Sequence, residues 1–406
     1  MERNDLSIAS FTGLGHGVFH GFELVIPLFI PIWLATFDTS ATVLGIVVGA
    51  GYALIGLFAP VSGLLADKYG SKKLVLLSIG GMGVAFASLS VLQSIEALAV
   101  TLMLWGAAAS LYHPSGLSLI SRQVDERGKV LALHGAGGNI GMVVLPLAAI
   151  ILLAFFDWRL VALLLTLPAA ACVLIGFVLP IEEGTASDSG APTGSTSDLV
   201  DSLRIVATDT RSLFVGGFVL VFVVQMLYGV YYRGIFTFLP DVLTDLPIFE
   251  PISVGEQEIE AGQLAYSGLL LIGVFGQYAG GMFSDRGRPE LALLITFVTL
   301  LFASALFVPA SNAGIVPLLI ICTILGFFIY ALAPIMQTLV AEYVTADSHG
   351  LSFGYIYFGM FGVGALGAAV AGTTLDYGGI ASLFAVLAGL MGLALIVAGV
   401  LFRRAN

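Results

Sequence analysis

The chain has 406 residues, of which 58% are hydrophobic and only 10% are charged, and its mean hydropathy is +1.04. This composition excludes a water-soluble globular protein and predicts an integral membrane protein surrounded by the lipid bilayer. The formal net charge of −11 comes from acidic residues that are concentrated in the loops, so no nucleic-acid partner is expected.

About 20 apolar residues cross a bilayer as a helix, and counting on that basis predicts twelve spans in an all-α membrane protein. The first six spans are residues 8–36, 41–66, 74–92, 97–121, 130–156 and 160–180. The last six are residues 212–239, 261–284, 291–310, 314–341, 350–375 and 380–402. The loops between them are too short to hold soluble domains.

Basic residues indicate how the spans are oriented. When the N-terminus is placed in the cytoplasm, thirteen of the fifteen Lys and Arg residues fall on the cytoplasmic side. The exceptions are Arg159, in an outer loop, and Arg233, inside the seventh span. The positive-inside rule therefore predicts a multi-pass protein of the plasma membrane with both termini in the cytoplasm.

The composition changes between the sixth and seventh spans. Residues 182–201 are rich in Gly, Ser, Thr, Asp and Pro, which predicts a flexible cytoplasmic linker, and residues 199–208 have the pattern of a short surface helix. The predicted units are an N-terminal bundle (1–181), a linker (182–211) and a C-terminal bundle (212–406). The acidic outer loop 241–260 is expected to be irregular.

A short charged hairpin joins the second and third spans, with the sequence Gly63-Leu-Leu-Ala-Asp67-Lys68-Tyr-Gly70-Ser-Lys72. Gly63 lets another helix approach closely, and Gly70 allows the turn between antiparallel helices. Asp67 ends its own helix, where the macrodipole disfavours an anion, so it needs a partner on another element.

A weaker copy of this hairpin follows 218 residues later, as Gly281-Met-Phe-Ser-Asp285-Arg286. We expect the acid of the first copy to meet the start of the eleventh span, near residues 348–350. The acid of the second copy is expected to meet the start of the fifth span, near Lys129. Together the two contacts would gate the cytoplasmic side.

Both hairpins resemble the loop signature G-x-L-A-D-R-x-G-x-K of the major facilitator superfamily. The two halves also match elsewhere, with offsets that stay between 218 and 222 residues, in the pairs Pro114 and Pro334, Gly128 and Gly350, and Asp157 and Asp376. The resemblance implies twelve transmembrane helices in two pseudo-symmetric six-helix bundles. It also implies alternating access, with the first, fourth, seventh and tenth spans lining a central cavity.

Polar residues inside the spans mark a candidate substrate path, because ionisable side chains are costly in lipid. In the first span His16, His20 and Glu23 share one helical face, at spacings of four and three residues. The resemblance implies a substrate cavity lined by His16, His20, Tyr112, His113, Asn139, Gln225, Tyr228, Tyr232, Tyr330 and Gln337. Packing is an alternative role for the histidines and tyrosines.

Glu23 and Arg233 are charges inside spans, and each needs a partner. When Pro31 is aligned with Pro240 across the repeat, Glu23 falls level with Tyr232, so Arg233 lies at similar depth on the opposite helix. We predict that Glu23 is the main proton carrier, that Arg233 is its partner in one state, and that the neighbouring histidine at position 20 assists. The alternative is a permanent structural ion pair.

His16 and His20 have the i, i+4 spacing of a metal-binding pair, but the sequence fixes no further ligand. We therefore predict neither a metal site nor a cofactor. The sequence contains no nucleotide-binding loop and no nucleophile–base pair at a suitable spacing. Neither ATP-driven transport nor enzymatic catalysis is expected.

Three local patterns resemble the fosmidomycin-resistance branch of that superfamily. They are His16-x-x-x-His20 ahead of two prolines, Tyr112-His113-Pro114, and the Gly-Gly-Asn-Ile-Gly run around Asn139. His20 stands where the branch has an acid. The resemblance implies a transporter that exports a drug-like or small organic compound in exchange for protons. We also expect the protein to be a monomer. Proton-coupled or facilitated uptake, and a transporter-like sensor without net flux, are the alternatives.

Overall fold

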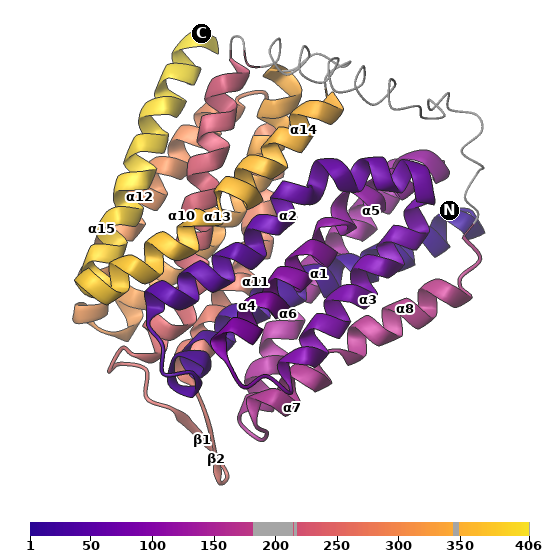
Figure 1. Cartoon of the computed structure of the whole chain (residues 1–406). Coiled ribbons are helices and arrows are strands. Elements are labelled where there is room, and N and C mark those ends of the chain that lie inside the picture. The colour runs from indigo at the N-terminus through magenta and orange to yellow at the C-terminus, as the bar shows by residue number, and fades with distance from the viewer. Residues whose placement is uncertain (182–213, 215–216, 344–348, 406) are drawn as a thin grey trace.

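The computed structural model describes residues 1–181, 214, 217–343 and 349–405, and these residues are mostly helical (Figure 1). The N-terminal part consists of α1 (Arg3–Thr36), α2 (Ala41–Tyr69), α3 (Ser71–Leu89), α4 (Ile95–Ser110), α5 (Tyr112–Gln123), α6 (Arg127–Leu153), α7 (Trp158–Leu164) and α8 (Leu167–Val178). The C-terminal part consists of α10 (Phe218–Thr244), β1 (Ile252–Val254), β2 (Gln257–Ile259), α11 (Ala261–Ser284), α12 (Pro289–Ala313), α13 (Ile315–Tyr343), α14 (His349–Tyr357), the π-helical segment η3 (Phe358–Val363) and α15 (Leu366–Ala405).

The number of membrane passes agrees with the prediction. In the described part of the chain, ten helical stretches are long and apolar enough to cross a membrane. One of them, Gly354–Arg404, holds two passes, because the backbone of Gly379 adopts φ 67° and ψ −171° and reverses the helix there. α11 adds a less apolar pass of 24 residues. The ten stretches thus account for eleven passes, because one of them holds two, and α11 is the twelfth.

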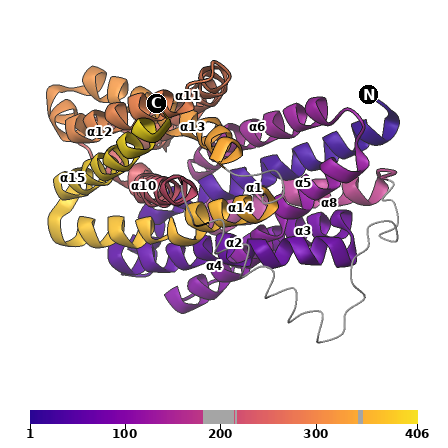
Figure 2. The same ribbon diagram turned by 90° about the horizontal axis from the view of Figure 1, so that it is seen from above.

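The helices gather into two groups that meet in the middle of the molecule. α1–α8 lie on one side and α10–α15 on the other, with the N-terminus at the right of the view and the C-terminus at the top, each at the far end of its own group (Figure 1). Seen from above, α1, α2 and α6 face the C-terminal helices, and α3 and α8 lie farther away (Figure 2). The predicted linker at 182–211 and the surface helix within it lie outside the described residues.

The segment ahead of α11 is more regular than the sequence analysis predicted. α10 continues to Thr244, and β1 and β2 then form an antiparallel hairpin with Ile252 opposite Ile259. The two-residue connection begins with Gly255, whose φ of 68° suits a tight hairpin turn. The prediction of an irregular loop is therefore wrong here, because Ile252 and Val254 alternate on one side of a glycine turn and Ile259 pairs with Ile252 from the other side.

The two groups are joined at the end opposite the chain termini. The carboxylate of Asp376, near the Gly379 reversal, accepts hydrogen bonds from the backbone N–H groups of Ala41 (3.1 Å) and Thr42 (2.8 Å). It therefore caps the first turn of α2 from the other half of the molecule. Farther along α2, a Cβ atom added to Gly49 would lie 3.0 Å from the carbonyl oxygen of Ala365. Small residues thus let the α2 and α15 backbones approach closely.

The opposite end, which carries the hairpin motifs, lacks such close packing. Nothing among the described residues lies within 4 Å of a Cβ atom added to Gly63 or Gly281. The close helix approach predicted at Gly63 is therefore absent from this conformation. Gly70 has a φ of 93°, as the predicted turn requires.

Removing the Asp376 cap should loosen the joined end. A cap of this kind contributes about 0.5–2 kcal/mol, and its exposed position favours the lower part of that range. We therefore expect Asp376→Ala to raise labelling of an Ala41→Cys reporter by an impermeant maleimide roughly two- to fivefold. The buried Cys172 and Cys322 are first replaced by alanine.

Asp157→Ala is the matched control for this measurement. Asp157 occupies the equivalent position of the repeat, but its carboxylate accepts a hydrogen bond from the backbone N–H of Arg159 (2.9 Å) within its own bundle. Equal labelling in the two variants would contradict a role for Asp376 in holding the two halves together.

Candidate functional site

A buried ion pair joins the two groups of helices. The guanidinium of Arg233 on α10 pairs with a carboxylate oxygen, Oε1, of Glu23 on α1, and the two side chains are 2% and 1% exposed, respectively. The pairing predicted from the alignment of Pro31 with Pro240 is thus present in the structure. The ion pair therefore links the two bundles directly, through one charged side chain from each.

Aromatic rings surround the guanidinium. The Arg233 Cζ atom lies 3.6 Å from the ring centroid of Tyr52, 5.4 Å from that of Tyr232 and 5.5 Å from that of Phe361. Such cation–π contacts stabilise a cation most when water is excluded. The Tyr52 hydroxyl also donates to the backbone carbonyl of Glu23 at 2.9 Å. Arg233 is therefore held by charge, by aromatic faces and by a tyrosine that is itself fixed to α1.

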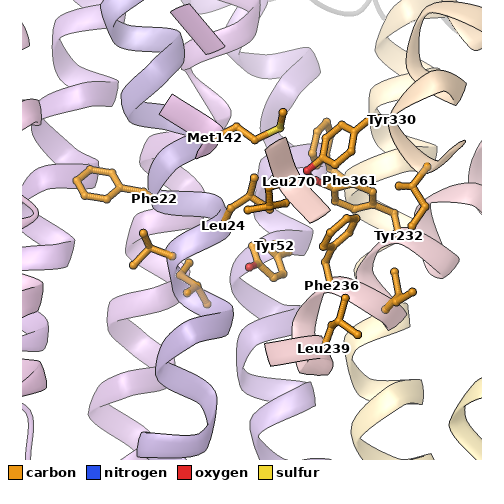
Figure 3. Packing of buried hydrophobic residues seen from close by; sticks show 14 of the residues in the cluster. Phe22, Leu24, Tyr52, Met142, Tyr232, Phe236, Leu239, Leu270, Tyr330 and Phe361 are labelled. Carbon is orange, nitrogen blue, oxygen red and sulfur yellow. Dashed lines mark hydrogen bonds between the residues drawn. The ribbon is translucent and has the colours of Figure 1, made fainter. Parts of the chain in front are cut away.

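Two of these rings, Tyr52 and Phe361, were absent from the predicted site. Tyr52 follows a glycine-rich stretch of α2, and Phe361 lies in η3. Tyr52 could have been predicted as a site residue, because it places a polar hydroxyl group within an otherwise apolar transmembrane run. Figure 3 shows Tyr52 and Leu24 on the N-terminal side of the contact between the two groups of helices. Tyr232, Phe236 and Phe361 lie on its C-terminal side.

The carboxylate of Glu23 is shared with a histidine. His20 Nδ1 lies 2.7 Å from Glu23 Oε2, the oxygen that Arg233 leaves free. The His20 side chain is 26% exposed, whereas Glu23 is almost fully buried. A proton moving between the surroundings and Glu23 therefore has a partly exposed imidazole as its nearest intermediate stop.

A cluster of histidines continues from His20 toward α5 and α6. The ring centroid of His16 lies 4.6 Å from that of His20, 5.3 Å from that of His113 and 4.0 Å from that of His134. His16 Nδ1 lies 2.9 Å from the backbone carbonyl oxygen of His134. The structure thus brings the predicted histidines of the first and fourth spans together and adds His134 from α6.

Tyrosines line the C-terminal side of the ion pair. The hydroxyls of Tyr232 and Tyr330 lie 3.3 Å apart, and the Tyr228 hydroxyl donates to the Ile329 carbonyl at 3.0 Å. The Tyr266 hydroxyl donates to the Leu24 carbonyl at 3.3 Å and so bridges the two bundles. Tyr266, on α11, was not predicted as a site residue, and its contact depends on tertiary packing alone.

The remaining predicted cavity residues lie in other settings. The Tyr112 hydroxyl donates to the backbone carbonyl of Thr12, and the ring is fully buried, so it ties α5 to α1. Gln225 is buried, Asn139 is half-buried and Gln337 is exposed. Within the described ranges, none of these three amides has a hydrogen bond to the ion pair. Their assignment to the cavity stays a prediction.

The predicted cytoplasmic latch is described only in part. The Asp67 side chain and residues 344–348 lie outside the described residues. Asp285 is exposed, and Lys129 pairs with Glu126 instead. Hydrogen bonds from Lys129 and from the N-terminal ammonium lower the pKa of Glu126 to about 2. The latch between Asp285 and Lys129 is therefore not formed in this conformation and stays a prediction for the closed gate.

The basic residues of the two hairpins contact groups within their own halves of the chain. Lys72 Nζ donates to the Leu179 carbonyl at 3.1 Å. Lys68 Nζ lies 5.2 Å from the ring centroid of Tyr69. The guanidinium of Arg286 lies 5.6 Å from the ring centroid of Phe283. These contacts hold the cations at the ends of their helices.

Comparison with known proteins adds the family context. Residues 12–321 and 246–406 match the family model described as Major Facilitator Superfamily. The uncharacterized transporter YqjV of Bacillus subtilis (strain 168) is 24% identical over 373 residues, which are 90% of this chain and 87% of the relative. The multi-drug resistance efflux pump PmrA of Streptococcus pneumoniae serotype 4 is 27% identical over 233 residues, which cover 55% of this chain and 56% of the pump.

Solved structures share the fold along nearly the whole chain. A D-xylose–proton symporter superposes with a TM-score of 0.77 at 12% identity, covering 97% of each chain. The nucleoside transporter NupG superposes with a TM-score of 0.75 at 15% identity, covering 98% of this chain and 99% of the transporter. At such identities the likeness concerns the arrangement of the helices.

Proposed function

The chain belongs to the major facilitator superfamily and is a multi-pass membrane transporter, and on that premise we propose that it exports a small organic compound in exchange for protons. The two bundles rock about the level of Glu23 and Arg233, so that this level opens to each side of the membrane in turn. Both termini lie in the cytoplasm, and the protein works in the plasma membrane as a monomer.

The observation that carries the proposal is the carboxylate of Glu23, which is held between an arginine and a histidine from different elements. One oxygen pairs with Arg233 of the opposite bundle, and the other faces His20 of its own helix. A carboxylate that takes up a proton loses its attraction for the guanidinium, because the pair then lacks one charge. Protonation through His20 would therefore release the contact between the bundles, and deprotonation would restore it.

Efflux and the substrate class rest on two further observations. PmrA, which matches about half of the chain, is named as a multidrug efflux pump. The Nε atom of Arg233 is buried and has no hydrogen-bond partner in the described structure, although an N–H group in such a place ordinarily has an acceptor. A compound with an aromatic body and an acidic or strongly polar group would suit this donor and the surrounding rings.

Substrate-dependent proton movement in reconstituted vesicles tests the proposal. The purified chain is placed in liposomes that enclose a pH-sensitive dye, and a panel of aromatic acids, neutral drugs and cationic dyes is added outside. Antiport makes the lumen more alkaline as the compound enters, whereas symport makes it more acidic. Protein-free liposomes are the control. Net uptake of a labelled compound without any change in lumenal pH would reject proton coupling.

A further inference from the structure

We propose that His16, His20 and His113 form a binding site for a divalent transition-metal ion of the Zn²⁺ class. The site goes beyond the transport function proposed above and does not depend on it. His16 and His20 lie one turn apart on α1, and α5 places His113 beside them. One ring nitrogen from each of the three lies within 4.8 Å of the others. The sequence indicated only the pair on α1, and the fold supplies the third ligand.

The hydrogen bonds leave a ring nitrogen free in each imidazole. A backbone carbonyl only accepts, so His16 Nδ1 carries the proton that it donates to the His134 carbonyl. His20 Nδ1 donates in the same way to the carboxylate of Glu23. In the neutral forms of both rings, Nε2 then keeps its lone pair. Among the described residues, His113 Nε2 is buried without any partner, which is unusual for a polar atom.

This pattern matches the outer contacts of known metal-binding histidines. A histidine ligand ordinarily donates its second ring N–H to a carboxylate or a backbone carbonyl, which fixes the tautomer and the ring orientation. His16 has the carbonyl version of this contact, and His20 has the carboxylate version. Glu23 also supplies negative charge behind His20, which offsets part of the charge of an incoming cation.

The size of the cluster suits an ion bound by imidazole. Zn–N bonds of 2.0–2.1 Å at tetrahedral angles place the nitrogens roughly 3.4 Å apart. The three side chains must therefore draw together slightly, and their partial exposure leaves them room to do so. Three imidazoles suit Zn²⁺, Ni²⁺, Co²⁺ or Cu²⁺ better than Mg²⁺ or Ca²⁺, which prefer oxygen.

The surroundings favour three protein ligands and one open position. The ring of Phe19 lies 4.5 Å from that of His113, and the ring of Tyr357 lies 5.7 Å from it. The Phe19 ring adds no ligand atom on its side. A fourth position would thus be filled by water or by a small ligand, as in other three-histidine sites.

Metal binding is measured on the full chain in detergent, purified without a polyhistidine tag. Zn²⁺ is titrated by calorimetry, and Co²⁺ is followed by its visible absorption, which reports the ligands and their geometry. We expect one ion per chain. His16→Gln and His113→Gln should each weaken binding by at least about tenfold, the lower limit seen when even an outer contact of a metal site is lost.

Two further variants guard against misfolding and misassignment. His113→Cys keeps a ligand at the same place, so it should still bind Co²⁺ and add a thiolate-to-metal absorption band. His134→Gln is the matched control, because the ring of His134 stacks on His16 but lies outside the converging set, so binding should be retained. The proposal is overturned if the wild type binds no stoichiometric ion, or if the double variant His16→Gln/His113→Gln binds as tightly as the wild type.

Discussion

Replacing Arg233 by leucine should destabilise the protein by about 3–5 kcal/mol, because it leaves the buried Glu23 carboxylate without its strongest partner. The Arg233 guanidinium is 2% exposed, so water cannot take over its role. For a chain of 406 residues, such a loss corresponds to a fall in melting temperature of roughly 4–6 °C. A thermal-shift measurement on the purified protein in detergent checks this value.

A double-mutant cycle separates the ion pair from the general cost of changing a buried residue. Glu23→Gln/Arg233→Leu removes both charges, and pairs replaced in this way often lose little stability. We therefore expect the double variant to melt close to the wild type. Arg159→Gln is the control for removing an arginine outside the ion pair. The Arg159 guanidinium donates a hydrogen bond to the Leu92 carbonyl and stacks on Trp158. Additive losses in the double variant would show that the two charges do not depend on each other.

Much of the fold could be predicted from the sequence because the bilayer and the repeat constrain it. The thickness of the bilayer sets the length of each apolar run, so twelve passes could be counted before any packing was known. The repeat gives the depth of a residue on each helix, which is why aligning Pro31 with Pro240 placed Glu23 beside Arg233. Knowing the depth and the helical face of each residue was enough to predict the pairing between α1 and α10, because these two helices face each other directly.

The neighbours of the ion pair were harder to predict, because contacts across the bundles depend on how each helix is rotated. Tyr52 and Phe361 reach Arg233 from α2 and η3, and neither helix carries a charge that marks its inner face. Tyr266 meets α1 through a backbone carbonyl, which leaves no trace in the sequence. The third histidine of the proposed metal site likewise joins its partners only through the packing of α5 on α1.

The type of contact predicted for the cytoplasmic gate, an acid that caps a helix of the other half, is found at the opposite end of the molecule. The expectation was that an acid from one half would meet the start of a helix in the other half, on the cytoplasmic side. In the described structure this arrangement occurs between Asp376 and the first turn of α2. A single sequence does not reveal which of the two ends is closed, because alternating access needs both closures in turn.

Glu23→Gln should abolish concentrative transport while leaving exchange of substrate almost unchanged. Glutamine keeps the size of the side chain and can still accept from Arg233 and His20, but it cannot load and release a proton. In vesicles with a gradient of one pH unit, each exchanged proton allows about tenfold accumulation of the compound. The wild type should approach that limit, and the variant should stop at a ratio of about one. Exchange of labelled for unlabelled compound needs no net proton movement, so it should persist.

Two comparisons make the Glu23 result specific. Glu290→Gln changes an acid on α12 that accepts a hydrogen bond from the Tyr343 hydroxyl (3.1 Å) far along the chain from the ion pair, and it should keep both accumulation and exchange. A permanent structural ion pair predicts instead that Glu23→Gln impairs accumulation and exchange to the same degree, because the site itself would be distorted. Uphill transport with normal pH dependence in the variant would move the coupling role elsewhere, to His20 or His113, the next ionisable groups along the cluster.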